Sequence, residues 1–199
     1  MLSDGPSDGP VLVLAHGAGA PMDSEFMNDM ALLLARRGVR VVRFEFPYMA
    51  ERRHSGKKRP PDRAPGLVAH FHQVLDELGS GSVYIGGKSM GGRMATLVAT
   101  ERDVAGVCVL GYPFHPPGKP EKTRLEHLPQ VRSPVLICQG ERDTLGTAAQ
   151  VGGYDLPETI RLVWCVDGDH SFKPRRVSGL RQSDNLAVAA DAIAGFIGV

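Results

Sequence analysis

Residues 82–101, SVYIGGKSMGGRMATLVATE, constrain the fold more than any other part of the chain. The segment begins as a short apolar run, passes through Gly87-Lys88-Ser89-Met90-Gly91, and continues with the apolar spacing of a helix. This is a G-x-S-x-G sequence between a strand and a helix, which is the context that a nucleophile elbow requires. Glycine suits the positions near Ser89 because so tight a turn leaves no room for side chains. We therefore expect Ser89 to project beyond the end of a buried strand.

A phosphate-binding loop is a second interpretation of the same residues. Gly87-Lys88-Ser89 matches the end of the P-loop motif, G-x-x-x-x-G-K-[S/T]. The first glycine of that motif would fall at position 82, where the chain has Ser82. Residues 83–86 have the pattern of a strand, and no aspartate after a strand suits a bound magnesium ion. The sequence therefore favours a serine nucleophile over a nucleotide-binding loop.

Length and charge limit the remaining classes of protein. The 199 residues, 42% of them hydrophobic, are enough for one domain with a buried core, and we expect residues 1–199 to form that single domain. Lysine and arginine total 23 against 22 acidic residues, so no overall field favours nucleic acid or a membrane surface. The first ten residues lack the pattern of a secretion signal, and no later stretch is long and apolar enough to span a bilayer. These features predict a soluble, cytoplasmic protein.

The cysteines and histidines give no sign of a metal site. Cys108, Cys138 and Cys165 each lie in an apolar, strand-like run, which is typical of buried free thiols. The chain contains no C-x-x-C pair and no histidine cluster with metal-ligand spacing. We therefore predict neither a metal nor another cofactor.

Apolar runs alternate with helical patterns along the whole chain. Six runs are typical of strands: residues 11–15, 39–46, 82–86, 104–110, 134–139 and 160–166. Helical patterns start near residue 23 or 24 and end at Gly38, cover residues 68–78, follow Ser89, and cover residues 183–197. The alternation predicts a three-layer α/β/α sandwich with a mostly parallel, six-stranded sheet.

Three segments outside this alternation are expected to be irregular. The first ten residues are polar and rich in turn formers, and residues 51–63, ERRHSGKKRPPDR, are a charge run typical of a solvated loop. Residues 111–133 are a proline-rich connection with at most a short helix around 122–127. This connection is too short to be a separate lid domain.

Polar groups follow four of the predicted strands directly. His16 and Gly17 follow the first strand, Ser89 the third, Asp143 the fifth, and Asp169 with His170 the sixth. An open parallel sheet places its chemistry beyond the carboxyl ends of its strands. We therefore expect these groups to converge at one edge of the sheet.

The segments HGAG, GKSMGG, GERDTLG and DGDH, in this order, resemble the α/β-hydrolase superfamily over nearly the whole chain. Within it, the chain resembles the small lidless branch that is called dienelactone-hydrolase-like. The segments FPYMAERR and GKSMGGR are similar to the hydrolase-like domain of the third subunit of the non-specific lethal chromatin complex and its bacterial relatives. The resemblance implies a sheet without the family's first two strands, in the local order 2-1-3-4-5-6.

The resemblance also implies a catalytic triad. Ser89 matches the nucleophile, Asp143 the acid and His170 the base, in the chain order of this family. Dienelactone hydrolases use cysteine as the nucleophile, so the serine here leaves their substrate in doubt. In such a triad the histidine takes the serine proton, and the aspartate fixes the imidazole tautomer. The backbone N–H groups of Met90 and of Ala18, or else Gly19, are the candidates for the oxyanion hole.

Other roles for the same residues remain open at this point. Asp143 could instead cap the following helix through Thr144, and Asp167 or Asp169 could contact His170 in its place. His16 has the position of a structural partner of the oxyanion loop. These alternatives differ in which side chains touch His170.

Two functions follow from the pattern. The first is a serine hydrolase that cleaves a small ester, thioester or amide, and the alternative is a hydrolase-fold module that binds protein partners with little or no turnover. Arg52, Arg53 and Lys88 are candidate substrate-binding residues because they follow or end strands at the expected site, and they would favour an anionic substrate. Lys173, Arg175 and Arg176 follow His170 and would add to the same positive field.

Overall fold

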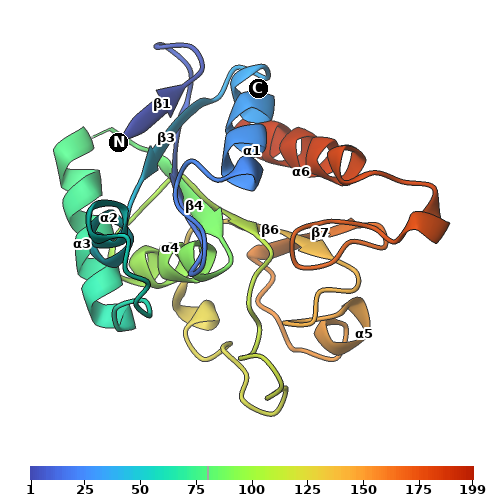
Figure 1. Cartoon of the computed structure of the whole chain (residues 1–199). Coiled ribbons are helices and arrows are strands. Elements are labelled where there is room, and N and C mark those ends of the chain that lie inside the picture. The colour runs from blue at the N-terminus through green and yellow to red at the C-terminus, as the bar shows by residue number, and fades with distance from the viewer. Residues whose placement is uncertain (80) are drawn as a thin grey trace.

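The computed structural model describes residues 1–79 and 81–199, and within them seven strands form one sheet. The strands follow the spatial order β1-β3-β2-β4-β5-β6-β7, so that β1 and β7 lie at opposite ends of the sheet (Figure 1). All neighbouring pairs are parallel except β1 and β3, which are antiparallel. The strands are β1 Leu2–Asp4, β2 Val11–Ala15, β3 Arg40–Phe44, β4 Tyr84–Lys88, β5 Gly106–Leu110, β6 Val135–Gly140 and β7 Ile160–Cys165.

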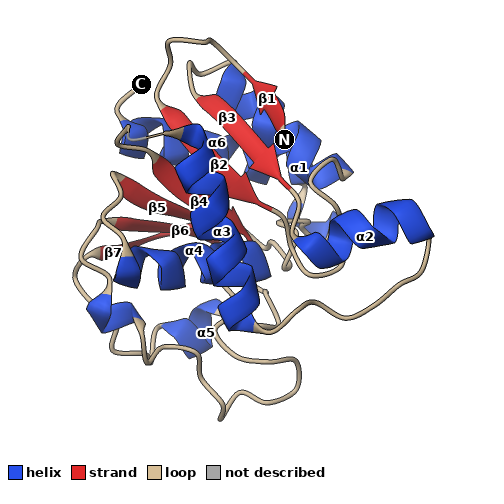
Figure 2. Cartoon of the chain, turned by 90° about the vertical axis from the view of Figure 1, so that its left-hand side faces the viewer, coloured by secondary structure: helices blue, strands red, loops and turns tan. Residues whose placement is uncertain are grey.

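Helices cover both faces of the sheet, which gives the predicted three layers. Helices α3 and α4 pack together on one face, and α1 and α6 pack together on the other (Figure 2). The helices are α1 Glu25–Ala35, α2 Pro47–Ser55, α3 Ala64–Leu78, α4 Met90–Glu101, α5 Ala148–Val151 and α6 Gln182–Ile197, with short 3₁₀ turns at Leu128–Gln130 and Arg176–Ser178. Two cores result, one on each face.

Strand β2 shows how an apolar run serves both cores. Val13 and Ala15 pack into the core under α3 and α4, whereas Leu12 and Leu14 pack into the core under α1 and α6. All four side chains are fully buried. Successive side chains of a strand point to opposite faces, so a strand covered on both sides needs an apolar residue at every position. The three cysteines are free and buried in the described structure, as predicted.

The strand count is the first difference from the prediction. The predicted α/β class and the order of the six predicted strands are confirmed, but the sheet has a seventh strand, β1, at its edge. It lies in the polar N-terminal stretch and pairs Leu2 with Arg43 and Asp4 with Val41. The Asp4 carboxylate also accepts a hydrogen bond from Arg43 at 2.8 Å. A three-residue edge strand with exposed residues carries no hydrophobic alternation, so the sequence pattern gave no signal for it.

The charge run is the second difference. Residues 51–55 are not loop, because helix α2 continues through them to Ser55. Pro47 lies at the start of this helix, where its missing N–H costs nothing, and Tyr48 and Met49 are buried. The helix ends at Gly56, whose φ of 68° is left-handed. Two buried residues in the first turn thus anchor a helix whose remaining turns are charged.

The proline-rich connection agrees with the prediction of at most a short helix. No helix forms over residues 122–127; the 3₁₀ turn Leu128–Gln130 follows them instead, with Leu128 fully buried. No α-helix occurs anywhere in residues 111–133. The described residues also contain no helix with the length and apolarity needed to cross a membrane.

Candidate active site

Three predicted site residues come together at the carboxyl edge of the sheet. Ser89 follows β4, Asp143 follows β6, and His170 follows β7. His170 Nε2 lies 2.8 Å from Ser89 Oγ, and His170 Nδ1 lies 2.7 Å from Asp143 Oδ2. An ionised carboxylate can only accept, so the Nδ1–H donates to Asp143 and Nε2 is left to accept the Ser89 hydroxyl proton. The three side chains form one continuous hydrogen-bonded chain.

The backbone at Ser89 is strained, as a nucleophile elbow demands. Its φ of 52° is in the left-handed region, which a residue with a side chain rarely adopts. A Cβ on Gly87 would lie 2.5 Å from the Gly91 carbonyl carbon, and a Cβ on Gly91 would lie 2.6 Å from the Ala15 carbonyl oxygen. Only glycine fits at either position. The close approach of β4, α4 and β2 therefore holds Ser89 in this turn.

Asp143 is fully buried and held at both carboxylate oxygens. Oδ1 accepts from the Leu145 N–H at 2.9 Å, and Oδ2 accepts from Gln139 Nε2 at 2.9 Å in addition to His170. Helix α5 is capped by Thr147 through a capping box, so Asp143 does not cap that helix. These donors fix the carboxylate in the orientation that meets His170.

Gln139 is a functional candidate that sequence reasoning missed. It is fully buried in β6, and its side-chain amide accepts from the Tyr112 N–H at 2.7 Å and donates to Asp143 and to the Gly146 carbonyl. All its polar atoms are thus satisfied by the loops after β5 and β6. The sequence feature that indicates this role is a glutamine in the otherwise apolar run VLICQG. Burying an amide is unfavourable unless it has hydrogen-bond partners, so such a glutamine predicts a polar contact.

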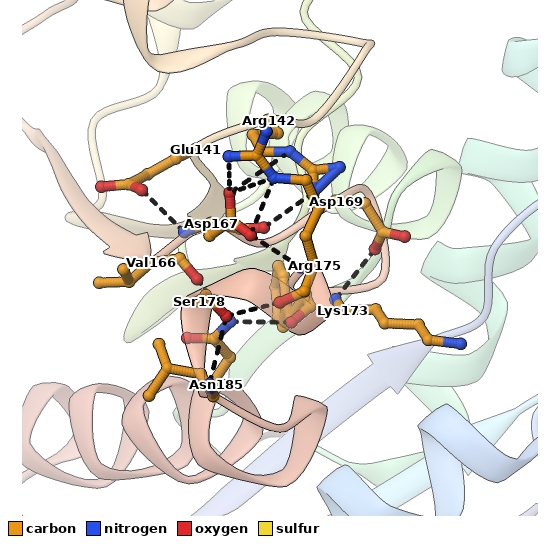
Figure 3. Close-up of polar contacts among 11 residues, drawn as sticks. Glu141, Arg142, Val166, Asp167, Asp169, Lys173, Arg175, Ser178 and Asn185 are labelled. Atoms are coloured by element: carbon orange, nitrogen blue, oxygen red, sulfur yellow. Dashed lines mark hydrogen bonds and ion pairs between the residues drawn. The ribbon is translucent and has the colours of Figure 1, made fainter.

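In the described part of the chain, the carboxylates of Asp167 and Asp169 form no hydrogen bond with the His170 ring, and Figure 3 shows the partners that they have instead. The Asp167 carboxylate is bound by Arg175 at 2.5 Å and lies 3.5 Å from the guanidinium of Arg142. The hydrogen bond from Arg175 is the main reason that the pKa of Asp167 is lowered. Asp169 accepts from the backbone N–H groups of Ser171 and Lys173 and so closes the turn that carries His170.

Lys88 lies against His170 and is nearly buried. Its ammonium donates to the His170 carbonyl at 2.6 Å and lies 5.3 Å from the centre of the Phe26 ring. Burial lowers the pKa of Lys88 to about 8, against the opposing field of Asp143 and Asp169. A Cβ on Gly111 would lie 3.0 Å from the Lys88 ammonium and 3.3 Å from His170 Nδ1, so glycine there leaves space for both groups.

The loop after β2 carries the predicted oxyanion donors. His16 Nδ1 donates to the Gly17 carbonyl at 2.7 Å, and its Nε2 accepts from the Phe46 N–H at 3.1 Å. Burial lowers the pKa of His16, in keeping with this neutral tautomer. The Tyr48 hydroxyl donates to the Ala18 carbonyl at 2.9 Å. His16 and Tyr48 therefore hold the carbonyl groups of Gly17 and Ala18 at the start of the loop, and His16 takes the structural position that was expected of it.

The remaining oxyanion candidate, the backbone N–H of Met90, lies beside Ser89. Met90 is the first residue of α4, so its N–H has no carbonyl partner within the helix. A cavity of about 330 Å³ opens at Ser89 and His170 and is lined on its other side by Gly17, Ala18 and Gly19. An oxyanion formed at Ser89 would thus lie between the loop after β2 and the start of α4.

The predicted basic residues are not brought together. Lys88 lines the cavity with Ser89, but Arg52 and Arg53 line a different one, with Glu45 and Met49. Arg53 is paired with Asp23 at 2.8 Å and also with Glu45. Among the residues that the structure describes, no group of three or more histidine, cysteine, aspartate or glutamate side chains could hold a metal ion.

Comparison with known proteins gives the same architecture. The family model for the alpha/beta hydrolase domain matches residues 8–198. A dienelactone hydrolase from Anabaena variabilis is similar in structure, with a TM-score of 0.75 and 21% identity over 97% of this chain and 87% of that one. XC6422 from Xanthomonas campestris, a serine hydrolase without a lid, gives 0.72 and 17% over 99% and 88%. Est1E from Butyrivibrio proteoclasticus gives 0.70 and 17% over 98% and 90%.

Proposed function

This chain belongs to the alpha/beta hydrolase domain family, and from that premise we propose that it is a serine hydrolase that cleaves a small ester, thioester or amide. The proposal includes a covalent acyl-enzyme on Ser89 and a single domain over residues 1–199. Its main support is the hydrogen-bonded chain from Ser89 through His170 to Asp143, with contacts of 2.8 and 2.7 Å. A serine hydroxyl is a weak nucleophile at neutral pH, and such a chain supplies the base that it lacks.

The first half of the reaction forms the acyl-enzyme. His170 Nε2 takes the Ser89 proton as Oγ attacks the substrate carbonyl carbon, which gives a tetrahedral intermediate with a negatively charged oxygen. The N–H groups of Met90 and of Ala18 or Gly19 stabilise this oxygen, each by about 3 kcal/mol. The protonated His170 then gives its proton to the leaving group as the bond between carbonyl carbon and leaving group breaks.

The second half releases the acid. Water enters on the side that the leaving group has vacated, His170 takes one of its protons, and the hydroxide oxygen attacks the acyl carbon. The second tetrahedral intermediate collapses, Ser89 Oγ leaves, and His170 returns the proton to it. Asp143 keeps the Nδ1–H of His170 in place throughout and stabilises the imidazolium twice in each cycle.

A small and accessible substrate fits the surroundings of Ser89. The cavity there is about 330 Å³, and no α-helix of the connection after β5 lies over it as a lid domain would. Two of the similar structures are named as a dienelactone hydrolase and as a serine hydrolase without a lid, which supports hydrolysis as the reaction. A small-molecule substrate is therefore the partner that we propose.

Turnover of a panel of acetate and butyrate esters, thioesters and anilides tests this function. We expect the wild-type protein to hydrolyse at least one class, and Ser89→Ala to lose the activity while it unfolds at a similar temperature. This substitution removes only the hydroxyl group, so an unchanged unfolding temperature shows that the loss of activity is not a loss of folding. A protein that hydrolyses no member of the panel would instead support the hydrolase-fold interaction module.

A further inference from the structure

A second cavity is lined by Ser89 but not by His170. Its volume is about 310 Å³, and it shares only Ala18 and Ser89 with the cavity that contains His170. Met90 and two arginines, Arg93 and Arg124, contribute to its lining. Ser89 therefore lines two cavities, and a substrate cleaved at its hydroxyl has space in both.

The two arginines of the second cavity lack anionic partners. Within residues 1–79 and 81–199, neither guanidinium forms an ion pair with a carboxylate. Arg93 Nε is buried and has no hydrogen-bond partner there, and both side chains are half-buried. Burial, followed by the like charge of Arg93, lowers the pKa of Arg124. Two neighbouring cations thus lie partly out of water without an anion between them.

Two half-buried arginines without an anionic partner lower the stability of the folded protein unless a bound anion compensates for them. A buried donor without an acceptor and two like charges in a partly dry cavity both destabilise the free protein. The guanidinium group matches carboxylate and phosphate oxygens with two parallel hydrogen bonds, and it is the usual side chain for such anions. An anion held by Arg93 and Arg124 would satisfy both.

Arg53 shows what a compensated arginine looks like in the same protein. Its guanidinium donates to Asp23 and Glu45, and these contacts raise its pKa. An arginine already bound to two carboxylates has few donors left for a substrate. The charge pattern of the sequence pointed to Arg52 and Arg53, whereas the arginines that line a cavity with Ser89 are Arg93 and Arg124.

We propose that Arg93 and Arg124 form an anion-binding subsite and that the substrate carries a carboxylate or phosphate group close to its cleaved bond. The inference rests on the proposed function. Arg93 lies four residues after Ser89 on α4, which is about 6 Å along the helix axis. Because Ser89, Arg93 and Arg124 line one cavity of about 310 Å³, the anionic group is separated from the reacting carbonyl by only a few bonds, or by one aromatic ring.

Matched aryl esters test the subsite. The leaving-group series is 4-acetoxybenzoate, 4-acetoxyphenyl phosphate and the neutral 4-acetoxybenzamide, and the acyl series is the 4-nitrophenyl esters of terephthalic acid and of 4-carbamoylbenzoic acid. The two series report on which side of the bond the anion lies, and the first two esters separate carboxylate from phosphate. We expect kcat/KM to favour at least one anionic ester over its neutral match by about 10-fold or more, and less so at high salt.

Variants assign that preference to residues. Arg93→Gln and Arg124→Gln should each remove most of the anionic preference, about 10-fold, chiefly by lowering kcat/KM for the anionic ester. Arg93→Lys should retain part of it, since charge without the bidentate fork remains. Arg102→Gln is the matched control, because it removes the same charge at the far end of α4, where Arg102 pairs with Asp76. Loss of the preference in Arg52→Gln or Arg53→Gln alone would overturn the proposal.

Calorimetric binding to Ser89→Ala separates the subsite from turnover. The probes are the product-like 4-hydroxybenzoate and 4-hydroxyphenyl phosphate, with 4-hydroxybenzamide as the neutral match. We expect one anion to bind, and Arg93→Gln in the same background to lose that binding. If the enzyme is active but its kcat/KM is equal for anionic and neutral esters, the subsite is overturned and the proposed function stays intact. Anion binding without any ester turnover supports the subsite and overturns the proposed function, and absence of both overturns both.

Discussion

Asp143 and Asp167 follow neighbouring parallel strands at the same edge of the sheet, yet their surroundings are opposite. Asp143 is fully buried, and its hydrogen bonds come from an amide, a backbone N–H and His170. Asp167 is less deeply buried and is bound by Arg175 with Arg142 nearby (Figure 3). One carboxylate is held in place by neutral donors, and the other is paired with cations.

This difference decides which carboxylate can act on a histidine. A carboxylate held by neutral donors keeps its negative charge available to a developing imidazolium, and in a dry site that charge acts strongly. A carboxylate already paired with arginine has that charge compensated, and it serves to hold two segments together. Both carboxylates follow a strand, so that position alone does not identify the catalytic acid. The hydrogen-bond partners of each carboxylate distinguish Asp143 from Asp167.

The largest effect is expected from Asp143→Asn, compared with Asp167→Asn. Replacing Asp143 removes the acceptor for the His170 Nδ1–H and should lower kcat by about 10⁴-fold. Asp167→Asn touches no group in the hydrogen-bonded chain, so its kcat should stay within a few-fold of wild type. Steady-state kinetics on the best ester measures both. A larger loss in Asp167→Asn, or in Asp169→Asn, would transfer the role of the acid to that residue.

The next largest effect is expected in the pH dependence of stability and comes from Lys88. This residue is a buried cation near Asp143, and the two form no ion pair in the described structure. Its pKa is lowered to about 8 in the folded protein, so between pH 8 and the ordinary value of 10.5 the unfolded chain binds more protons. Stability contributed by this residue must therefore rise with pH across that window, by about 3 kcal/mol in all. Unfolding free energies of wild type and Lys88→Met, measured from pH 7 to 11, isolate this difference.

Wild type should gain stability relative to Lys88→Met as the pH rises, because the uncharged amine is cheaper to bury. The variant is the control for all other groups that titrate in the same range. A difference that stays constant, or that falls with pH, would mean that Lys88 remains charged through a stronger tie to Asp143. The neutral surroundings inferred for Asp143 would then be incorrect.

The smallest effect concerns acid stability at Asp167. The hydrogen bond from Arg175 lowers its folded pKa below the ordinary 3.8, so its contribution to stability is present above the unfolded pKa and is lost as the pH falls through the folded one. Solvent screens this pair, so we expect only a slight decrease in melting temperature for Asp167→Asn at pH 6 and none at pH 2. A decrease that grows toward pH 2 would exclude this pairing as its cause.

Sequence patterns predicted the parts of the molecule that local chemistry determines. Ser89 was identifiable because a strained turn requires glycine on both sides, and β2 because a strand covered on both faces must be apolar throughout. Edge strand β1 was not, since three exposed residues leave no periodicity. Helix α2 was hidden because two buried residues at its start, Tyr48 and Met49, decide its position and the charged remainder does not.

Pairing over long sequence distances was the other part that the pattern could not supply. Arg53 is bound by Asp23, which lies 30 residues earlier. Its charge looks unpaired in the sequence but is paired in the fold. The buried contacts of Gln139 with Tyr112 and Asp143 are likewise fixed only when the loops after β5 and β6 meet. Chain order predicted the candidate triad residues, whereas the partners of each charge depend on the folded loops.

Intact-mass measurement of labelling by a fluorophosphonate tests the central claim most directly. Attack on phosphorus needs a serine activated by its own base, so wild type and Asp167→Asn should each gain one adduct at Ser89 at similar rates. Asp143→Asn should label far more slowly, and Ser89→Ala should not label at all. An adduct at another residue, no adduct on the wild type, or equal labelling of Asp143→Asn and wild type would contradict the account.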